Sequence, residues 1–485
     1  MDNLDWEVLA RQRGDHVSRS GAQVLPIAAM AARAARDTPD AIAFIDGSES
    51  IRFATVYQEA CQLANSLWAL GLRPGDVLSF QLPNWSEAAV INLAACLCGL
   101  VVNPVVPIYR DAELSMILRD CRSRVFFVPG TWRGLDYSEM AQRVAEQVPS
   151  LKHVIHVRSP GALEYRALVD AGAGRSTQLP SVSPDAVKLI MYTSGTTGPA
   201  KGVLHSHRSL PVAIDSAVRY WGWQRGDALL MPSPVTHITG YCIGLEMPFS
   251  TGTTTVLMER WNAADAARLI QEHRIVGTVG ATPFLQELCE AVESSGGAPL
   301  PIKVFACGGA AVPAPLIFRA GRCFEGYACR VYGSTESPLV TFGCLPDDPE
   351  EIGARTDGRI NDYAVRIVDA SEREVGIGVE GEILVQGTGM FLGYANPANT
   401  REAFTQDGFF RTGDIGFRAA DDTLTITGRK KDLIIRGGEN ISAKEIEDVL
   451  HRHPQIVEAA VVSAPHARMG ESIAVYLRTH EGVQL

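Results

Sequence analysis

A run of ten residues in the middle of the chain combines the groups that hold phosphate. From Thr193 to Gly202 it reads Thr-Ser-Gly-Thr-Thr-Gly-Pro-Ala-Lys-Gly, directly after an apolar stretch. Glycines let the backbone approach an anion, backbone N–H groups and hydroxyls can donate to phosphate oxygens, and lysine adds positive charge. It is not a P-loop, because Gly202 follows Lys201 where that motif has Ser or Thr. The pattern predicts a phosphate-binding loop, and the simpler alternative is a flexible surface loop.

Three further segments combine glycine, hydroxyl and charged residues. They read Tyr-Gly-Ser-Thr-Glu at 332–336, Arg-Thr-Gly-Asp-Ile-Gly at 411–416, and Gly-Arg-Lys-Lys-Asp at 428–432 followed by Gly-Gly-Glu-Asn-Ile at 437–441. With the phosphate segment, and in this order, they resemble the motifs of the adenylate-forming (ANL) superfamily. That superfamily contains acyl- and aryl-CoA synthetases, firefly luciferase and peptide-synthetase adenylation domains. The resemblance covers nearly the whole chain from about residue 27.

The resemblance implies an ATP-dependent acyl-CoA ligase. Such an enzyme joins a carboxylic acid to AMP with release of pyrophosphate, and then transfers the acyl group to the thiol of CoA. ATP, Mg²⁺ and CoA are therefore the expected cofactor and substrates. The first half-reaction needs positioning and charge neutralisation more than covalent chemistry from the protein.

The resemblance also assigns nucleotide-binding roles. Glu336 would hold Mg²⁺, a hard cation suited to carboxylate and phosphate oxygens. Asp414 would accept hydrogen bonds from both ribose hydroxyls, with Arg429 assisting, and Tyr332 would lie against the adenine ring. The full expected set for ATP or AMP is Thr193, Ser194, Gly195, Thr196, Thr197, Gly198, Lys201, Gly308, Gly309, Ala310, Tyr332, Gly333, Ser334, Thr335, Glu336, Asp414 and Arg429. The catalytic residues among them would be Thr193, Lys201 and Glu336, joined by His237.

The acyl pocket is expected around His237, which lies in a Pro-x-x-His-x-x-Gly segment that ends at Gly240. The resemblance places this segment near the reacting carboxylate, together with Gly308 and Tyr332. A lone histidine in an apolar stretch is more often structural, so that alternative stays open. Two other histidines, His205 and His207, are interpreted as helix-start or surface residues.

The resemblance further implies a hinge at Lys431, where the C-terminal unit would rotate between the two half-reactions. Gly437, Gly438 and Glu439 would then face the channel for the CoA thiol. A plain charged loop is the alternative for this segment.

Short strands alternate with helices over the first 350 residues, which predicts an α/β fold with parallel-type sheets flanked by helices. We expect an N-terminal adenylation domain over 1–428, with a small β-rich subdomain at about 350–428. A hinge at 429–431 would lead to a partial α+β C-terminal domain over 432–485.

Relatives in this superfamily carry a later Gly-Lys motif whose lysine contacts the α-phosphate and the acid. No such lysine follows Gly470-Glu471 in this sequence. We therefore expect a truncated C-terminal domain and weak adenylation by the chain as it stands.

Composition excludes some classes. The net charge of -11 and the lack of a dense Lys/Arg cluster argue against nucleic-acid binding. The ten cysteines show no Cys-x-x-Cys or zinc spacing, which favours reduced, buried thiols and a cytoplasmic protein. The apolar run from Ala88 to Val106 is interrupted by two asparagines, so we expect a buried helix and strand rather than a membrane span. Peripheral membrane contact and oligomerisation stay open.

The expected acid is a medium-chain fatty acid or a cyclic acid. Two alternatives are kept. One is a stand-alone adenylation enzyme that loads a carrier protein; the other is a nucleotide-binding relative without turnover. CoA-dependent AMP formation would separate a ligase from the relative without turnover, and replacing CoA with a carrier protein would separate the two enzymes.

Overall fold

The structure is a computed structural model that describes residues 25–161, 163–193, 200–436, 439–450, 453, 455–466 and 468–479.

Its first seven-stranded sheet has the order β15-β14-β13-β11-β12-β1-β2, and all neighbours are parallel except β1 and β2. The strands are β1 (Ile42–Asp46), β2 (Glu49–Arg52), β11 (Ala228–Met231), β12 (Thr254–Leu257), β13 (Gly277–Gly280), β14 (Val304–Cys307) and β15 (Tyr327–Arg330).

A second seven-stranded sheet has the order β18-β10-β9-β4-β3-β5-β8. Its β9–β10 and β10–β18 pairs are antiparallel, and the other pairs are parallel. The strands are β3 (Val77–Phe80), β4 (Val101–Pro104), β5 (Ser123–Pro129), β8 (His153–Val157), β9 (Val187–Thr193), β10 (Lys201–Ser206) and β18 (Gly393–Tyr394). A small ribbon pairs β6 (Thr131–Trp132) with β7 (Leu135–Asp136).

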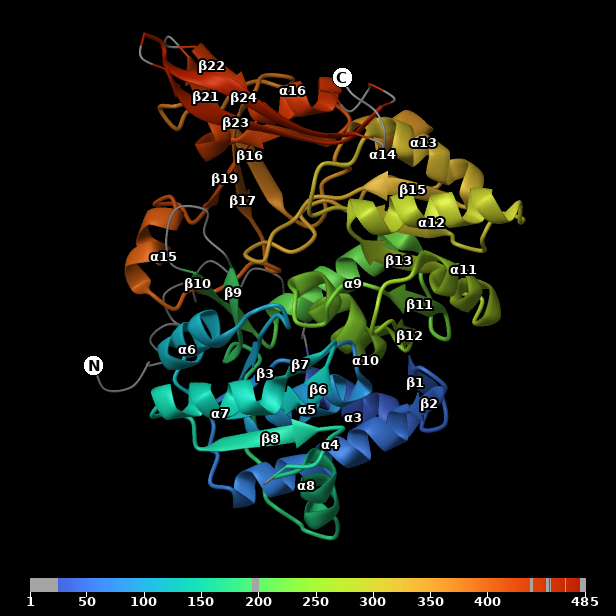
Figure 1. Cartoon of the computed structure of the whole chain (residues 1–485), viewed down its shortest axis with the longest axis vertical. Coiled ribbons are helices and arrows are strands. Elements are labelled where there is room, and N and C mark those ends of the chain that lie inside the picture. Colours follow the sequence, from blue (N-terminus) through green and yellow to red (C-terminus); the bar gives the residue numbers. More distant parts are fainter. Residues whose placement is uncertain are drawn as a thin grey trace.

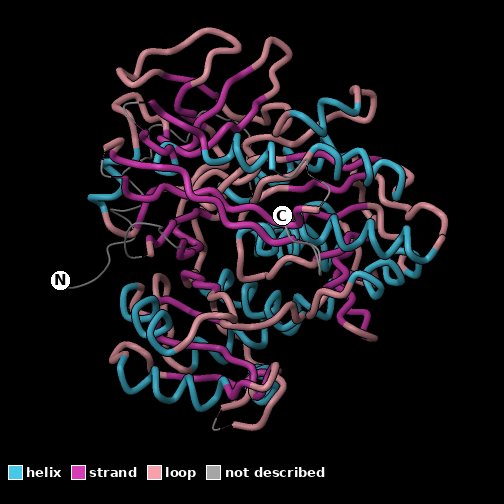
Figure 2. Tube along the Cα trace, turned by 45° about the horizontal axis from the view of Figure 1, so that its top comes forward, coloured by secondary structure: helices cyan, strands magenta, loops and turns pink. Residues whose placement is uncertain are grey.

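Helices pack on both sheets, as the layers in Figure 1 and Figure 2 show. They are α3 (Ile27–Asp37), α4 (Phe53–Ala69), α5 (Ser86–Cys98), α6 (Asp111–Asp120), α7 (Tyr137–Gln147), α8 (Tyr165–Gly172), α9 (Ser209–Trp221), α10 (Met247–Thr251), α11 (Ala263–Glu272), α12 (Thr282–Ser295), α13 (Ala314–Cys323), α14 (Glu350–Arg355), α15 (Pro397–Ala403) and α16 (Ala443–Leu450), with a π-helix η1 (Gly240–Glu246) and a 3₁₀ turn η2 (Lys430–Asp432). The expected α/β class is confirmed.

The largest apolar core joins the two seven-stranded sheets. Helices α4 and α5 contribute most of their apolar residues to it, beside Leu78 and Met191 of the second sheet and Leu229 and Val304 of the first. The apolar run from Ala88 to Val106 is therefore a buried helix leading into the buried strand β4, as expected. Within the described residues, no helix has both the length and the apolar composition that crossing a bilayer requires.

Two four-stranded sheets follow in the chain. The first has the order β16-β17-β19-β20 and is antiparallel, with β16 (Ala364–Val368), β17 (Gly381–Gln386), β19 (Phe410–Arg418) and β20 (Leu424–Arg429). The second has the order β22-β21-β24-β23, with β21 (Leu433–Arg436), β22 (Glu439–Ser442), β23 (Ile456–His466) and β24 (Gly470–Thr479). Figure 1 shows this last sheet at the top of the molecule, above β16, β17 and β19.

Candidate active site

A cavity of about 1140 Å³ brings the four sequence motifs together. Of the expected site residues, Thr193, Lys201, His237, Gly308, Gly309, Tyr332, Gly333, Ser334, Thr335, Glu336, Asp414, Arg429 and Lys431 line it. Ser194, Gly195, Thr196, Thr197, Gly198, Gly437 and Gly438 lie outside the described residues, and Glu439 is described only by its backbone pairing with Arg436. The start of the phosphate segment and Asp414 therefore share one cavity, although more than 200 residues separate them.

The β9–β10 hairpin presents the two ends of the phosphate segment. Thr193 pairs with Lys201 across the two strands, and the Thr193 hydroxyl lies 3.5 Å from the Lys201 carbonyl oxygen. The side chain of Lys201 is exposed at the cavity, and its Nζ lies 5.1 Å from the ring centroid of Tyr394. The hairpin thus places a threonine and an ammonium group at the same end of the cavity.

The loop after β15 supplies the second motif. Strand β15 ends at Arg330, and the Tyr332 amide donates to the Thr341 hydroxyl at 2.8 Å rather than to a neighbouring strand. Gly333 is needed in this turn, since a Cβ there would lie 2.6 Å from the amide nitrogen of Leu339. The turn directs Glu336 into the cavity, where its Oε1 accepts a hydrogen bond from the Tyr394 hydroxyl at 2.8 Å.

The interpretation of His205 and His207 as surface residues is wrong, because both side chains are buried. The helix-start interpretation is wrong for His205, which lies on β10, whereas His207 does lie in the turn before α9. His205 lies on β10, with Nε2 2.7 Å from the Thr335 carbonyl oxygen and Nδ1 3.0 Å from the Ser209 hydroxyl. Since a carbonyl only accepts, Nε2 carries the proton. Burial lowers the pKa of His205 to about 4, so the imidazole is neutral and holds the motif that contains Glu336.

Asp414 lies on β19, directly opposite Arg429 on β20. Its side chain is only 6% exposed, and the carboxylate accepts from Arg429 Nε at 2.8 Å and from the Tyr332 hydroxyl at 2.6 Å. Burial and the Asp414 carboxylate raise the pKa of Tyr332 well above its usual range, so the phenol stays a donor. A carboxylate has about four acceptor positions, so these two bonds leave capacity for the two hydroxyls of a ribose.

His237 lies between β11 and η1, where the Tyr241 amide donates to its carbonyl oxygen at 2.8 Å. Its side chain is exposed to the cavity, and desolvation by the surrounding protein lowers its pKa. Gly240, expected at the acyl pocket, is buried behind the wall, since a Cβ there would lie 2.1 Å from the Pro234 carbonyl oxygen. Gly240 therefore allows a close approach of two backbones. Ala310, also expected at the site, is exposed and outside the cavity lining.

The segment 429–431, which we expect from the sequence to be a hinge, contributes to the cavity lining. Strand β20 ends at Arg429, and the 3₁₀ turn η2 follows at once. Lys430 Nζ contacts Glu382 Oε2 at 2.8 Å, and Lys431 lines the cavity beside it. Glu382 and Tyr394 also line the cavity but were not predicted from the sequence. The local signal for Tyr394 is weak, because the sequence shows only that it follows Gly393.

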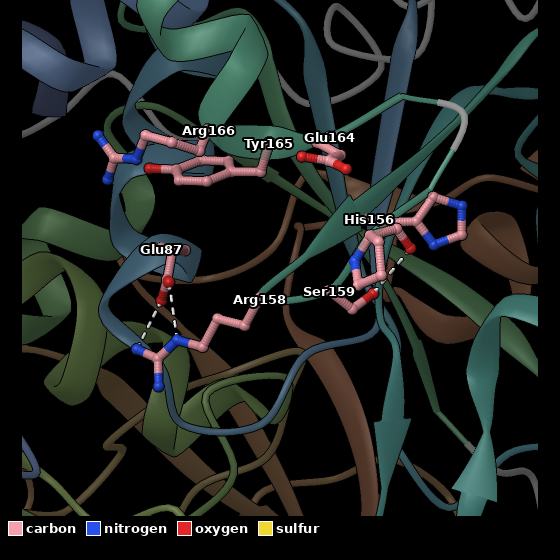
Figure 3. Close-up of a pocket in the computed structure, with 8 residues that line it drawn as sticks. Glu87, His156, Arg158, Ser159, Glu164, Tyr165 and Arg166 are labelled. Atoms are coloured by element: carbon pink, nitrogen blue, oxygen red, sulfur yellow. Dashed lines mark hydrogen bonds and ion pairs between the residues drawn. The ribbon is translucent and has the colours of Figure 1, made fainter.

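A second, smaller cavity of about 480 Å³ is lined by residues at the start of α5, at the end of β8 and at the start of α8 (Figure 3). Figure 3 shows Arg158 reaching toward Glu87, and its guanidinium contacts both carboxylate oxygens at 2.7 and 2.8 Å. Arg166 is likewise paired with Glu59 at 2.8 Å. Because both arginines of this cavity are paired with neighbouring carboxylates, we assign it no ligand.

Two models of known protein families match the chain. The family model described as "AMP-binding enzyme" matches residues 31–395, and that of the "AMP-binding enzyme C-terminal domain" matches residues 445–485. The first match covers more than half of the chain. The protein therefore belongs to the AMP-binding enzyme family.

Its curated relatives are ligases of carboxylic acids. It is 32% identical over 456 residues to the medium-chain fatty-acid–CoA ligase of Escherichia coli K12. The aligned region covers 91% of this chain and 79% of that relative. It is 33% identical over 441 residues to the sulfoacetate–CoA ligase of Cupriavidus necator, and this aligned region covers 90% of this chain and 84% of that relative. The ATP-bound structure of MatB from Rhodopseudomonas palustris superposes with a TM-score of 0.84 at 26% identity, over 95% of this chain and 90% of that one.

These matches confirm the expected class. The protein is an ATP-dependent acid–thiol ligase of the AMP-forming type, which activates a carboxylic acid as an acyl adenylate and transfers the acyl group to CoA.

Proposed function

We propose that the carboxylic acid is apolar, either a medium-chain fatty acid or an alicyclic acid, and that Thr193, Lys201, Glu336 and Asp414 bind the ATP that activates it. The observation that carries this proposal is that one part of the cavity lining contains charged side chains and another part contains none. Its charged lining residues come from the β9–β10 hairpin, from Glu336 and from positions after 380. The lining residues between positions 213 and 309 carry no Asp, Glu, Lys or Arg.

The uncharged part of the cavity is shaped for a hydrocarbon. Its walls include Ile238, Cys242, Ile243, Val279 and Phe284, with Leu339 facing from the loop after β15. Burying apolar surface there stabilises a bound alkyl or alicyclic group by about 25 cal/mol per Å². A second anionic group on the acid would be desolvated beside these walls without a cationic partner, which is costly. The wall thus favours an acid like that of the Escherichia coli relative over sulfoacetate.

The charged part suits ATP. Lys201 would donate to the β- and γ-phosphate oxygens, since an ammonium group adds charge-assisted hydrogen bonds. Asp414, fixed by Tyr332 and Arg429, would accept from the ribose hydroxyls. His237, which lines the same cavity, would contact the reacting carboxylate. These assignments place the acid and the α-phosphate next to each other, which is the main requirement of an in-line phosphoryl transfer.

We also propose Glu336 as the protein ligand of Mg²⁺. Among the described residues there is no group of three or more His, Cys, Asp and Glu side chains that would hold a metal by themselves. One carboxylate is enough for Mg²⁺ when ATP supplies phosphate oxygens, so the site fits this ion. Bound there, the ion would neutralise charge on the phosphates.

A cytoplasmic location is part of the proposal. All ten cysteines are free and nine of them are buried, as expected for a protein of a reducing compartment.

An acid panel tests the substrate class. Octanoate, cyclohexanecarboxylate, benzoate and sulfoacetate would each be incubated with ATP, Mg²⁺ and CoA, and AMP release measured. We expect kcat/KM for octanoate or cyclohexanecarboxylate to exceed that for sulfoacetate at least tenfold. A preference for sulfoacetate, or AMP release with a carrier protein but not with CoA, would contradict the proposal.

A further inference from the structure

Tyr394 is a residue of the site with no role in the proposed function so far. It lies on the short strand β18, which pairs with β10 so that Tyr394 is opposite Val203, two residues from Lys201. Its side chain is 5% exposed and its hydroxyl donates to Glu336 Oε1 at 2.8 Å. One tyrosine thus connects the strand of the phosphate hairpin with the carboxylate proposed to hold Mg²⁺.

The face of the same ring contacts the second ATP-binding group. Lys201 Nζ lies 5.1 Å from the Tyr394 ring centroid, within the range of a cation–π interaction. Nearby Phe391 packs edge-on against the ring, with centroids 5.0 Å apart and planes at 69°. The Phe391 amide in turn donates to the Glu336 carbonyl oxygen at 2.8 Å. Packing and hydrogen bonds therefore fix the ring relative to both Lys201 and Glu336.

The hydroxyl of Tyr394 is the donor in its contact with Glu336, because a carboxylate only accepts hydrogen bonds. A permanent donor to Oε1 restricts rotation of the Glu336 carboxylate. For Oε2 the structure shows no hydrogen-bond partner among the described residues, so this oxygen is available to a ligand.

We propose that Tyr394 is a positioning residue for ATP binding. Its hydroxyl holds Glu336 with Oε2 available to the divalent cation, and its ring holds Lys201 for the phosphates. This inference rests on the proposed roles of Glu336 and Lys201 and adds a residue that acts through both.

The two functions of the side chain can be separated by substitution. Tyr394→Phe removes only the hydroxyl, and Tyr394→Leu removes the hydroxyl and the ring. The probe is Mn²⁺, whose free concentration is followed by electron paramagnetic resonance in the presence of ATP and without acid or CoA. ATP binding in EDTA, measured by calorimetry, reports on Lys201 without a metal. The matched control is Tyr327→Phe, whose hydroxyl donates to the Cys344 carbonyl oxygen at 3.1 Å outside this cavity.

We expect Tyr394→Phe to raise the half-saturating Mn²⁺ concentration three- to tenfold, with metal-free ATP binding and the KM for the acid unchanged. Tyr394→Leu should weaken metal-free ATP binding as well. Tyr327→Phe should match the wild type in each measurement. Unchanged Mn²⁺ binding by Tyr394→Phe, or an equal loss in Tyr327→Phe, would overturn the inference.

A Glu336→Gln variant tests separately whether Glu336 binds the metal, which is the assignment on which this inference rests. If Glu336→Gln leaves Mn²⁺ binding with ATP unchanged, the assignment of the metal to Glu336 fails. If Glu336→Gln weakens binding and Tyr394→Phe does not, only the role of Tyr394 fails. In the Glu336→Gln background, the Tyr394→Phe change should cause no further loss of Mn²⁺ affinity.

Discussion

The Tyr332 hydroxyl donates a hydrogen bond of 2.6 Å to Asp414 Oδ2. This bond joins the loop after β15 to strand β19, although the two residues are 82 positions apart in the chain. Arg429 holds the other carboxylate oxygen from β20 at 2.8 Å. The acceptor proposed for the ribose is therefore oriented before ATP arrives, by one neutral and one cationic donor. Preorganisation of this kind reduces the entropy lost on binding.

Asp414→Asn should weaken ATP binding about 10- to 100-fold, because hydrogen bonds to a charged group contribute roughly 1.5–3 kcal/mol. Tyr332→Phe should cause a smaller loss, since it removes only the orienting donor. Calorimetric titration with ATP measures both. The control is Asp407→Asn, an exposed carboxylate that pairs with Arg366 outside the cavity. ATP affinity equal to that of the wild type in Asp414→Asn would show that the ribose lies elsewhere.

Lys201→Met should lower kcat/KM for ATP by about 10- to 100-fold and leave the KM for the acid nearly unchanged. The reason is that an ammonium group at the hairpin can make charge-assisted hydrogen bonds to phosphate, whereas the methionine thioether cannot. Steady-state kinetics with ATP varied at saturating acid test this. Lys303→Met, at an exposed position before β14, serves as the comparison. A larger change in the KM for the acid than for ATP would contradict the assignment.

Acid should destabilise the fold through His205 and His207. Burial lowers their pKa values to about 4 and about 3, from 6.5. Between those values and pH 6.5 the unfolded chain binds more protons than the folded one, so stability falls as the pH decreases. Each histidine should cost about 2 kcal/mol at pH 5 relative to pH 7.5. Urea unfolding at both values measures this, and His205→Gln should show the weaker dependence. The same pH dependence in the variant would exclude His205 as the cause.

A buried ion pair between β9 and η1 should contribute to stability only while both partners are present. Lys188 on β9 contacts Glu246 at the end of η1, and both side chains are fully buried. Asn92 adds a hydrogen bond to the same carboxylate at 3.1 Å. Lys188→Met alone should destabilise the protein by about 3–5 kcal/mol, because it leaves a buried charge without a partner.

The double variant Lys188→Met with Glu246→Leu should recover most of that loss. Urea unfolding of the single and double variants forms the required cycle. Additive losses in the double variant would show that the two side chains do not act as a pair.

Much of the site could be predicted from the sequence because its motifs are local. The phosphate segment follows β9, and Tyr332 to Glu336 follow β15, so a short window contains both the strand and its polar end. The burial of α5 and β4 could also be predicted, because an element buried on all sides needs a nearly continuous apolar sequence.

Long-range pairing could not be predicted in this way. Strand β1 joins a sheet whose other parallel strands come some 200 residues later, and nothing in its own five residues selects β12 as partner. His205 looked polar and exposed, but Thr335 supplies its partner from 130 positions away. Tyr394 was missed for the same reason, since its role depends on Glu336 and Lys201 rather than on its neighbours in sequence.

Acid-dependent exchange of labelled pyrophosphate into ATP tests the central claim most directly, because exchange requires reversible formation of the acyl adenylate in the shared cavity. With Mg²⁺ and octanoate or cyclohexanecarboxylate, label should enter ATP in the wild type faster than in a control without acid, although slowly because weak adenylation is expected. The rate should be at least tenfold lower in Asp414→Asn. Binding of ATP without exchange for every acid of the panel would contradict the account.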